Sequence, residues 1–165
     1  MALTIAELDV GGGVLALSPM PGRGGAYEAD LRDLLGFGPA LVLTMTTGEE
    51  LAEKGAEALP DDLARNGIAW RHLPIADFGA PDTATARLWP AASARTRGVL
   101  AQGGKVLIHC MGGCGRSGMA ALRLMVEARE EPSAALTRLR VVRPCAVETP
   151  EQYVWASGGG ANGAL

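Results

Sequence analysis

The sequence lacks a long apolar run, an excess of charge and a start that resembles a leader. Fifteen of its 165 residues are Lys or Arg and eighteen are Asp or Glu, so the formal net charge is −3 at pH 7. This near balance gives the chain no general attraction to nucleic acid or to an anionic membrane surface. No apolar run approaches the length of a membrane span, and residues 1–10 lack the basic start and apolar core of a secretion signal. We therefore expect a cytoplasmic protein that binds neither nucleic acid nor membrane.

Cysteine and histidine are also scarce. The three cysteines are Cys110, Cys114 and Cys145, and a cytoplasmic chain would keep them reduced. No cluster of His, Cys and acidic residues has the spacing of a metal site, so we expect no metal and no other cofactor. The length and the 48% apolar content predict one globular domain over residues 1–156, followed by a mobile, Gly-rich tail over residues 157–165. We expect this domain to be a monomer.

Runs with strand character alternate along the chain with runs that have helical spacing. The expected strands cover residues 14–17, 40–45, 68–75 and 105–109. The expected helices cover residues 27–35, 57–66, 83–102, 119–129 and 133–141, with a kink or a break at Pro90. Thr47 would cap a further short helix, with Glu49 and Glu50 in its first turn. The alternation predicts a single α/β domain whose central, mostly parallel sheet is flanked by helices on both faces.

A glycine-rich turn joins the last expected strand to the helix that follows it. Cys110 comes directly after the strand, and five residues separate it from Arg116, which opens the helix. Gly112, Gly113 and Gly115 let the backbone curl so that successive N–H groups point inward. The helix N-terminus adds about half a positive charge, and the planar guanidinium suits two oxygens of a phosphate. We expect an anion to bind the turn formed by Met111, Gly112, Gly113, Cys114, Gly115 and Arg116.

The same turn would activate Cys110. A thiol beside a helix N-terminus and an arginine loses its proton readily, and the thiolate is a strong nucleophile. The hydroxyl of Ser117 could donate to this sulfur and ease its departure when a covalent intermediate breaks down. The alternative is an ordinary strand–helix connection that contains an incidental buried cysteine.

The run His109-Cys110, five residues, Arg116-Ser117 resembles the signature of the cysteine-based protein tyrosine and dual-specificity phosphatases. Low-molecular-weight phosphatases and arsenate reductases share the Cys–Arg spacing, but their loop lies near the N-terminus, whereas here it lies two-thirds along the chain. The run Pro74–Pro81 resembles the general-acid loop of the family and is closest to bacterial relatives of the kinase-associated phosphatase. The resemblance implies a tyrosine phosphatase-like fold and a metal-independent hydrolysis of phosphomonoesters through a phosphocysteine.

The resemblance also implies roles for residues outside the turn. Asp77 would protonate the leaving oxygen and then activate water. The alternative is that Asp77 is an ordinary turn residue, and Asp82 is the reserve candidate for the acid. His109 would orient the loop backbone without taking a proton. Glu148 and Gln152 fall at two positions where the family has glutamine, and the first of these glutamines places the hydrolytic water in tyrosine phosphatases.

Two arginines and the two other cysteines also have expected roles. Arg23, in a Pro/Gly loop, belongs either to a plain connection or to a wall of the cleft that reaches toward an acidic substrate. Cys114 could trap the oxidised nucleophile as a disulfide, although a tight loop opposes the required geometry. Cys145 reads as a small core residue. Arg143 could pair with the nearby Glu148.

The substrate class is open in part. The turn contains no lysine, which a phosphoinositide phosphatase would usually carry, so we favour phosphoprotein substrates. No tyrosine-rich recognition loop is evident, so dual specificity is preferred over phosphotyrosine alone. The expected partners are a phosphorylated protein or a small phosphomonoester, with phosphate or sulfate ion bound in the turn. The alternative functions are a catalytically silent phosphoprotein-binding module and a thiol redox protein that uses Cys110 and Cys114.

Overall fold

A five-stranded sheet lies at the centre of the structure. This computed structural model describes residues 2–158, and its strands are β1 (Ala6–Val10), β2 (Gly13–Pro19), β3 (Leu41–Thr44), β4 (Ala69–His72) and β5 (Lys105–Cys110). The strand order is β1-β2-β5-β3-β4. β1 runs antiparallel to β2, and every other neighbouring pair is parallel. The prediction of a mostly parallel sheet is confirmed.

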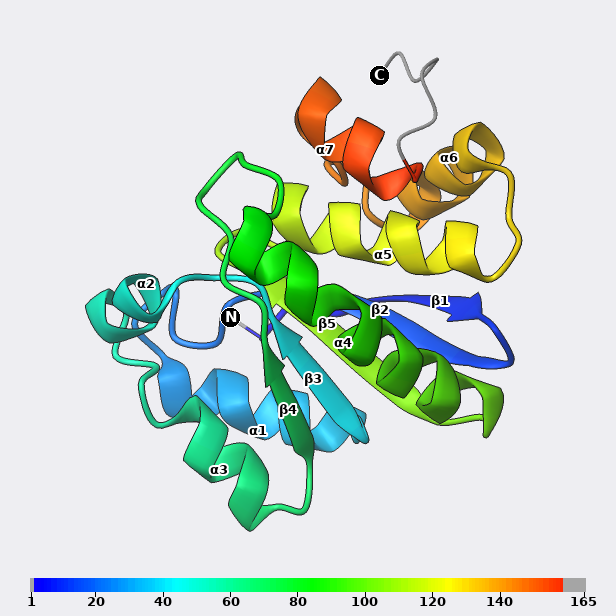
Figure 1. Cartoon of the computed structure of the whole chain (residues 1–165). Helices are drawn as coiled ribbons and strands as arrows, with labels where there is room; N and C mark the ends of the chain where they lie inside the picture. Colours follow the sequence, from blue (N-terminus) through cyan, green and yellow to red (C-terminus); the bar gives the residue numbers. More distant parts are fainter. Residues whose placement is uncertain (1, 159–165) are drawn as a thin grey trace.

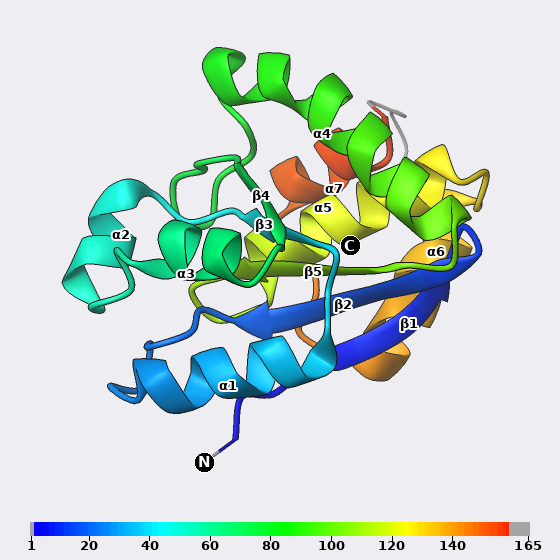
Figure 2. The ribbon, with the colours of Figure 1, turned by 90° about the horizontal axis from the view of Figure 1, so that it is seen from below.

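Helices cover both faces of this sheet. They are α1 (Tyr27–Phe37), α2 (Gly48–Glu53), α3 (Leu59–Arg65), α4 (Thr83–Ala101), α5 (Gly115–Glu127), α6 (Pro132–Val142) and α7 (Pro150–Ala156). Figures 1 and 2 show α4 and α5 on one side of the sheet and α1 and α3 on the other, so the predicted two-sided cover is confirmed. Within residues 2–158, no helix is long and apolar enough to cross a bilayer. Of the tail expected over residues 157–165, all but the first two residues lie outside the described part of the chain.

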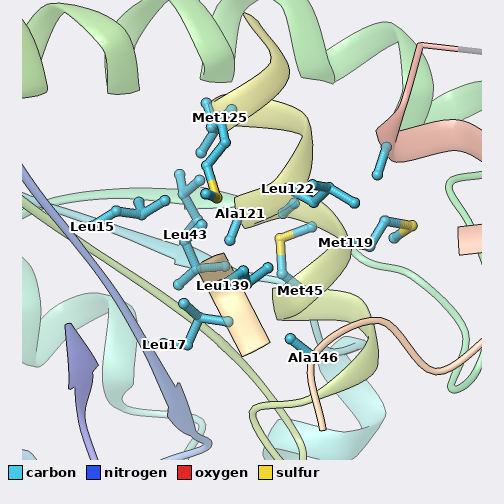
Figure 3. Close-up of a cluster of buried hydrophobic side chains, with 14 of the residues drawn as sticks. Leu15, Leu17, Leu43, Met45, Met119, Ala121, Leu122, Met125, Leu139 and Ala146 are labelled. Carbon is cyan, nitrogen blue, oxygen red and sulfur yellow. The ribbon is translucent and has the colours of Figure 1, made fainter. Parts of the chain in front are cut away.

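Neighbouring residues of the central strands face opposite helical layers. Val42 and Leu107 pack with the cluster under α1, α2 and α3, whereas Leu43 and Ile108 pack with the larger cluster under α4 to α7. All four side chains are fully buried. Figure 3 shows where the sheet meets α5 in the larger cluster, at Leu15, Leu17, Leu43, Met119, Leu122 and Met125. Burial on both faces explains why these strands are continuous apolar runs in the sequence.

The hairpin at the N-terminus was only half predicted. Gly11 and Gly12 form the expected turn, with φ angles of 59° and 95°, and Val10 pairs with Gly13. Positive φ at both central residues is typical of the two-residue turns that join antiparallel strands. The strand before this turn, β1, was missed, although its Leu8 and Val10 are buried and alternate with exposed residues.

Pro90 does not divide α4. The helix runs unbroken from Thr83 to Ala101, so the predicted break is wrong. Pro90 is exposed, while Trp89 and Ala92 on either side of it are buried against the core. This burial holds both halves of the helix on the sheet and compensates for the hydrogen bond that proline cannot donate.

One carboxylate joins α4 to α5. Glu127, the last residue of α5, accepts hydrogen bonds from Trp89 Nε1 (3.0 Å) and Ser93 Oγ of α4, and from Arg123 Nε (3.0 Å). Burial opposes its ionisation, but these hydrogen bonds outweigh burial and lower the pKa of Glu127. The ionised carboxylate therefore fixes the two helices against each other.

Candidate active site

A cleft of about 310 Å³ opens where β5 gives way to α5. Ligands of open α/β sheets bind at this end, beyond the carboxyl ends of the strands. Cys110 is the last residue of β5 and Gly115 is the first of α5, as the sequence predicts for a strand, a loop and a helix. The cleft is lined by Arg23, Asp77, Phe78, Cys110, Met111, Gly112, Cys114, Gly115, Arg116, Arg143 and Glu148.

The backbone of the Cys110–Arg116 loop is arranged for an anion. Every carbonyl oxygen from residue 111 to residue 114 accepts a hydrogen bond. The donors are Met20 N for Met111 O (3.2 Å), Arg143 for Gly112 O and Gly113 O (2.7 and 2.8 Å), and Gly118 N for Cys114 O (2.8 Å). By contrast, the N–H groups of residues 111–116 have no acceptor within residues 2–158. Since most of these residues line the cleft, their N–H groups are left to bind a ligand there.

The sulfur of Cys110 lies beside a hydroxyl. Cys110 Sγ and Ser117 Oγ are 3.3 Å apart, and Ser117 is fully buried in the first turn of α5. Cys110 is the free cysteine of the described residues, and only 3% of its surface is exposed. The structure thus brings these two side chains together in the arrangement that the sequence predicts.

Arg116 is buried between two carboxylates. Its guanidinium donates to both oxygens of Glu50, at 2.7 and 2.8 Å, and to Ile75 O at 2.9 Å. Asp77 Oδ1 lies 3.2 Å from Nη2 on the side of the cleft. Only 1% of the Arg116 side chain is exposed, so these partners fix its orientation.

Glu50 is the site residue that sequence reasoning missed. Burial opposes its ionisation, but hydrogen bonds from Arg116 and Thr47 outweigh burial and lower the pKa of Glu50. The Arg116 guanidinium is opposed by burial in the same way, yet the hydrogen bond to Glu50 and nearby negative charges raise its pKa. The sequence signal was present but had a local explanation, because Thr47 and Glu50 form a capping box at the start of α2. The sequence therefore predicts Glu50 only as an acidic residue in the first turn of a helix.

Asp77 lies at the rim of the cleft. Its side chain is 56% exposed and accepts a hydrogen bond from Phe78 N (3.0 Å) in addition to its contact with Arg116. The base of its loop is closed by Thr85 Oγ1, which donates to the carbonyl of Pro74 at 2.7 Å. Asp82, the reserve candidate, instead accepts from Thr85 N (2.8 Å) and caps α4. Of the two carboxylates, Asp77 is the one that faces the candidate site.

His109 is buried behind the loop in a chain of polar side chains. Trp70 Nε1 donates to Thr44 Oγ1 (2.8 Å), which lies 2.7 Å from His109 Nε2. An indole N–H can only donate, so the threonine oxygen accepts from Trp70 and links the indole to the histidine ring. Burial lowers the pKa of His109 to about 4, so the ring is neutral at pH 7. A neutral, fixed ring is compatible with the expected orienting role.

Glu148 and Gln152 take different places. Glu148 lines the cleft, and a Cβ added to Gly115 would overlap its Oε2 atom. Gln152 is fully buried, accepts from Glu148 N (2.9 Å) and donates to Gly79 O (3.1 Å) in the Asp77 loop. Glu148 is thus positioned to face a ligand, whereas Gln152 connects it to the loop that carries Asp77.

The expected pair between Arg143 and Glu148 is wrong. Arg143 donates instead to the carbonyl oxygens of Gly112 and Gly113. Main-chain acceptors carry no sequence signal, so a nearby carboxylate was the partner that the sequence offered. Arg23, the other arginine of the cleft, lies over Gly112, as its role in a cleft wall requires.

The cysteines also depart from expectation. Cys114 and Cys145 form a disulfide with their Cα atoms 5.1 Å apart, so the prediction of three reduced cysteines is wrong. The proposed trapping of oxidised Cys110 by Cys114, and a redox pair made of these two, are contradicted because Cys114 has another partner. Cys145 is exposed and is therefore not a core residue. The bonded cysteines are 31 positions apart, and the segment between them includes two helices, which hid their proximity from sequence reasoning.

A free, buried cysteine and a buried arginine on one loop with unpaired N–H groups, with an aspartate at the rim, are the arrangement of cysteine-based phosphatase domains. The family model described as "PTP-SAK: Swiss Army Knife protein, DSP-PTPase phosphatase domain" matches residues 20–154. The chain belongs to this family of dual-specificity and tyrosine phosphatase domains. The family that the sequence motifs resemble is thereby confirmed.

Individual relatives agree with this family. Cyclin-dependent kinase inhibitor 3 of Mus musculus is 34% identical over 128 residues, which is 76% of this chain and 59% of the relative. The Homo sapiens protein of the same name is 32% identical over 129 residues with the same two coverages. The chain therefore spans about three-fifths of the length of the curated relatives it matches.

Solved structures confirm the fold. The structure of kinase associated phosphatase, with serine in place of its catalytic-site cysteine, matches with a TM-score of 0.82 and 26% identity over 98% of both chains. Tk-PTP in its active form matches with a TM-score of 0.69 and 28% identity over 92% of this chain and 95% of its own. PTPMT1 in complex with PI(5)P matches with a TM-score of 0.69 at 17% identity, over 88% of each chain, and supports the fold alone.

Proposed function

We propose that this chain hydrolyses phosphomonoesters in two steps through a phosphocysteine, without a metal, and that its substrates are phosphorylated proteins. The observation that carries the proposal is the Cys110–Arg116 loop, in which other groups hold the carbonyl oxygens of residues 111–114 while the N–H groups of residues 111–116 stay unpaired within the described residues. Cys110 lies in the cleft lined by that loop. The loop dipoles and Arg116 supply the positive charge that phosphoryl transfer requires.

In the first step, Cys110 attacks phosphorus and the bond to the leaving oxygen breaks. The N–H groups of residues 111–116 and the Arg116 guanidinium hold the three equatorial oxygens and the charge that develops on them. Asp77, at the rim beside Arg116, protonates the leaving oxygen. The phosphoryl group is then bonded to the sulfur.

In the second step, water attacks the phosphocysteine. Asp77, now ionised, takes a proton from this water, and Ser117 donates to the departing thiolate from 3.3 Å. Glu148 faces the cleft at the position where tyrosine phosphatases place their water with a glutamine, so we assign it to the attacking water. Gln152 supports both Glu148 and the Asp77 loop through its two hydrogen bonds.

For the substrate, we favour phosphotyrosine together with phosphoserine and phosphothreonine in proteins. The loop has no lysine for additional lipid phosphates. Phe78, beside Asp77, is 60% exposed at the edge of the cleft, where a peptide side chain would arrive. Inorganic phosphate or sulfate should bind the loop. A cytoplasmic location and a monomeric state remain proposals from the sequence.

Hydrolysis of p-nitrophenyl phosphate in the presence of EDTA tests the reaction. We expect turnover that is lost in Cys110→Ser, together with a phosphorylated thiol on rapid quenching of the parent protein. A folded protein that binds phosphate but never releases nitrophenol would instead indicate a phosphoprotein-binding module. A panel of phosphopeptides, phosphoinositides and nucleotides then tests the substrate class, and preference for a lipid would contradict the protein assignment.

A further inference from the structure

A segment after α6 holds the loop from outside. We call residues 143–147 the strap, and its contacts with the loop all fall on residues 112–114, the outer turn of the loop. These contacts are Arg143 to Gly112 O and Gly113 O, the disulfide between Cys145 and Cys114, and Val147 N to Cys114 O (3.3 Å). Three hydrogen bonds and one covalent bond thus converge on three consecutive residues.

The strap is itself fixed from behind. Arg140 of α6 donates to Ala146 O (2.9 Å) and to Val147 O (2.8 Å). Ala146 and Val147 are buried, with 0% and 2% of their surfaces exposed. A Cβ added to Gly118 would lie 2.7 Å from Val147 N, so α5 packs directly against the strap backbone. The disulfide therefore ties the loop to a rigid part of the fold.

We infer that the Cys114–Cys145 disulfide positions the loop for phosphate binding, an inference that rests on the proposed function. Cys114 directly precedes α5, and the bond fixes its place relative to the strap. Without this bond, only the hydrogen bonds from Arg143, Val147 and Gly118 would hold the outer turn, and Gly112 and Gly113 would sample further backbone conformations. A loop that is competent for only part of the time binds its ligand with an apparent Kd raised by the inverse of that fraction.

The disulfide is accessible to a reductant. Cys145 is exposed, and Cys114 lines the cleft. A dithiol such as dithiothreitol breaks the Sγ–Sγ bond, gives one hydrogen to each sulfur and closes to its own cyclic disulfide. Cys110 is already a free thiol and is not changed by this step. Reduction of this disulfide should therefore weaken phosphate binding. Reduction of an oxidised nucleophile would have the opposite effect, because it would restore the function of the site.

Calorimetric titration of the whole chain with inorganic phosphate, before and after dithiothreitol, tests the inference. Alkylation and mass analysis record the state of each cysteine. If reduction leaves about one loop in five competent, the Kd rises roughly fivefold. The double variant Cys114→Ser, Cys145→Ser should show the weaker Kd with and without dithiothreitol. Leu63→Ala, in the core under α3, is the control that loses stability but keeps the Kd and its response.

Two results would overturn the inference: an unchanged Kd once the disulfide is shown to be open, or free Cys114 and Cys145 thiols in protein purified without reductant. Turnover of p-nitrophenyl phosphate is scored separately. No turnover with a responsive Kd removes the proposed hydrolysis and leaves the positioning role, whereas turnover with an unresponsive Kd removes the positioning role alone. If the double variant does not fold, the reduced parent protein decides the outcome.

Discussion

Replacing Glu50 by glutamine removes the charge that faces Arg116 and keeps the size of the side chain. Glu50 Oε2 accepts from Arg116 Nη1 (2.7 Å) and from Thr47 N (2.8 Å), while Oε1 accepts from Arg116 Nη2 (2.8 Å). A glutamine has one oxygen, so an NH₂ group must face one of these donors. The substitution therefore breaks one charge-assisted hydrogen bond and places two donors against each other.

The expected magnitude follows from burial. Breaking a fully buried ion pair by removing one partner costs about 3–5 kcal/mol. Because Glu50 is 18% exposed and one acceptor oxygen remains, we expect a loss of roughly 2 kcal/mol in the free energy of unfolding. The guanidinium would also lose its alignment with the cleft. About 2 kcal/mol of lost transition-state binding corresponds to a roughly 30-fold fall in kcat/KM.

The effect on stability should depend on pH. Folding lowers the pKa of Glu50 below its ordinary value of 4.5. Its ionised form therefore contributes stability that is complete above about pH 4.5 and is lost as the pH falls through the folded-state pKa. Glu50→Gln has no such group. The difference between the two proteins should accordingly shrink below pH 4.5.

Urea unfolding and p-nitrophenyl phosphate kinetics measure both effects. Glu49→Gln is the matched control, because Glu49 is the exposed neighbour in the same helix turn and makes no ion pair within the described residues. If Glu50→Gln and Glu49→Gln match in kcat/KM and in the free energy of unfolding, the ion pair does not position Arg116 and the reasoning fails.

Three other predictions concern the loops and their supports. Asp77→Asn should lower kcat by roughly 100-fold for alkyl phosphates and less for p-nitrophenyl phosphate, and equal effects on both leaving groups would remove its role as acid. Gly118→Ala should cost about 1–3 kcal/mol in urea unfolding because its Cβ would meet the strap backbone, whereas Gly98→Ala, with open space around it, should not destabilise. Reduction of the disulfide, which joins cysteines 31 positions apart, should lower stability by about 3–4 kcal/mol, and an unchanged melting temperature would contradict this.

The sequence was most informative where function depends on consecutive residues. Cys110, Arg116 and Ser117 lie within eight positions on a strand, a loop and a helix, so local geometry nearly determines how they meet. The carboxylate that orients Arg116 comes from 66 residues away, and its helix-capping pattern concealed its second role. Position in the chain gave no indication that Cys145 would reach Cys114.

The fold shows the same contrast between features with a clear local sequence pattern and features without one. Buried parallel strands are apolar on both faces and are easily recognised, whereas β1, at the edge of the sheet, carries the exposed Glu7 and Asp9, which alternate with its buried residues. Arg143 is the clearest example of a contact that the sequence does not predict, because its partners are carbonyl oxygens of glycines and no side chain marks them. Contacts with the main chain of a distant loop need coordinates to be seen.

The Glu127 carboxylate has a consequence for how the distance between Asp77 and Cys110 is maintained. α4 starts at the end of the Asp77 loop, and α5 starts in the loop that follows Cys110. Since Glu127 joins the two helices, the Asp77 loop and the loop after Cys110 are attached to one rigid unit. The distance that Asp77 can move is then set by the few residues between Pro74 and Asp82, and movements of whole helices contribute little to it.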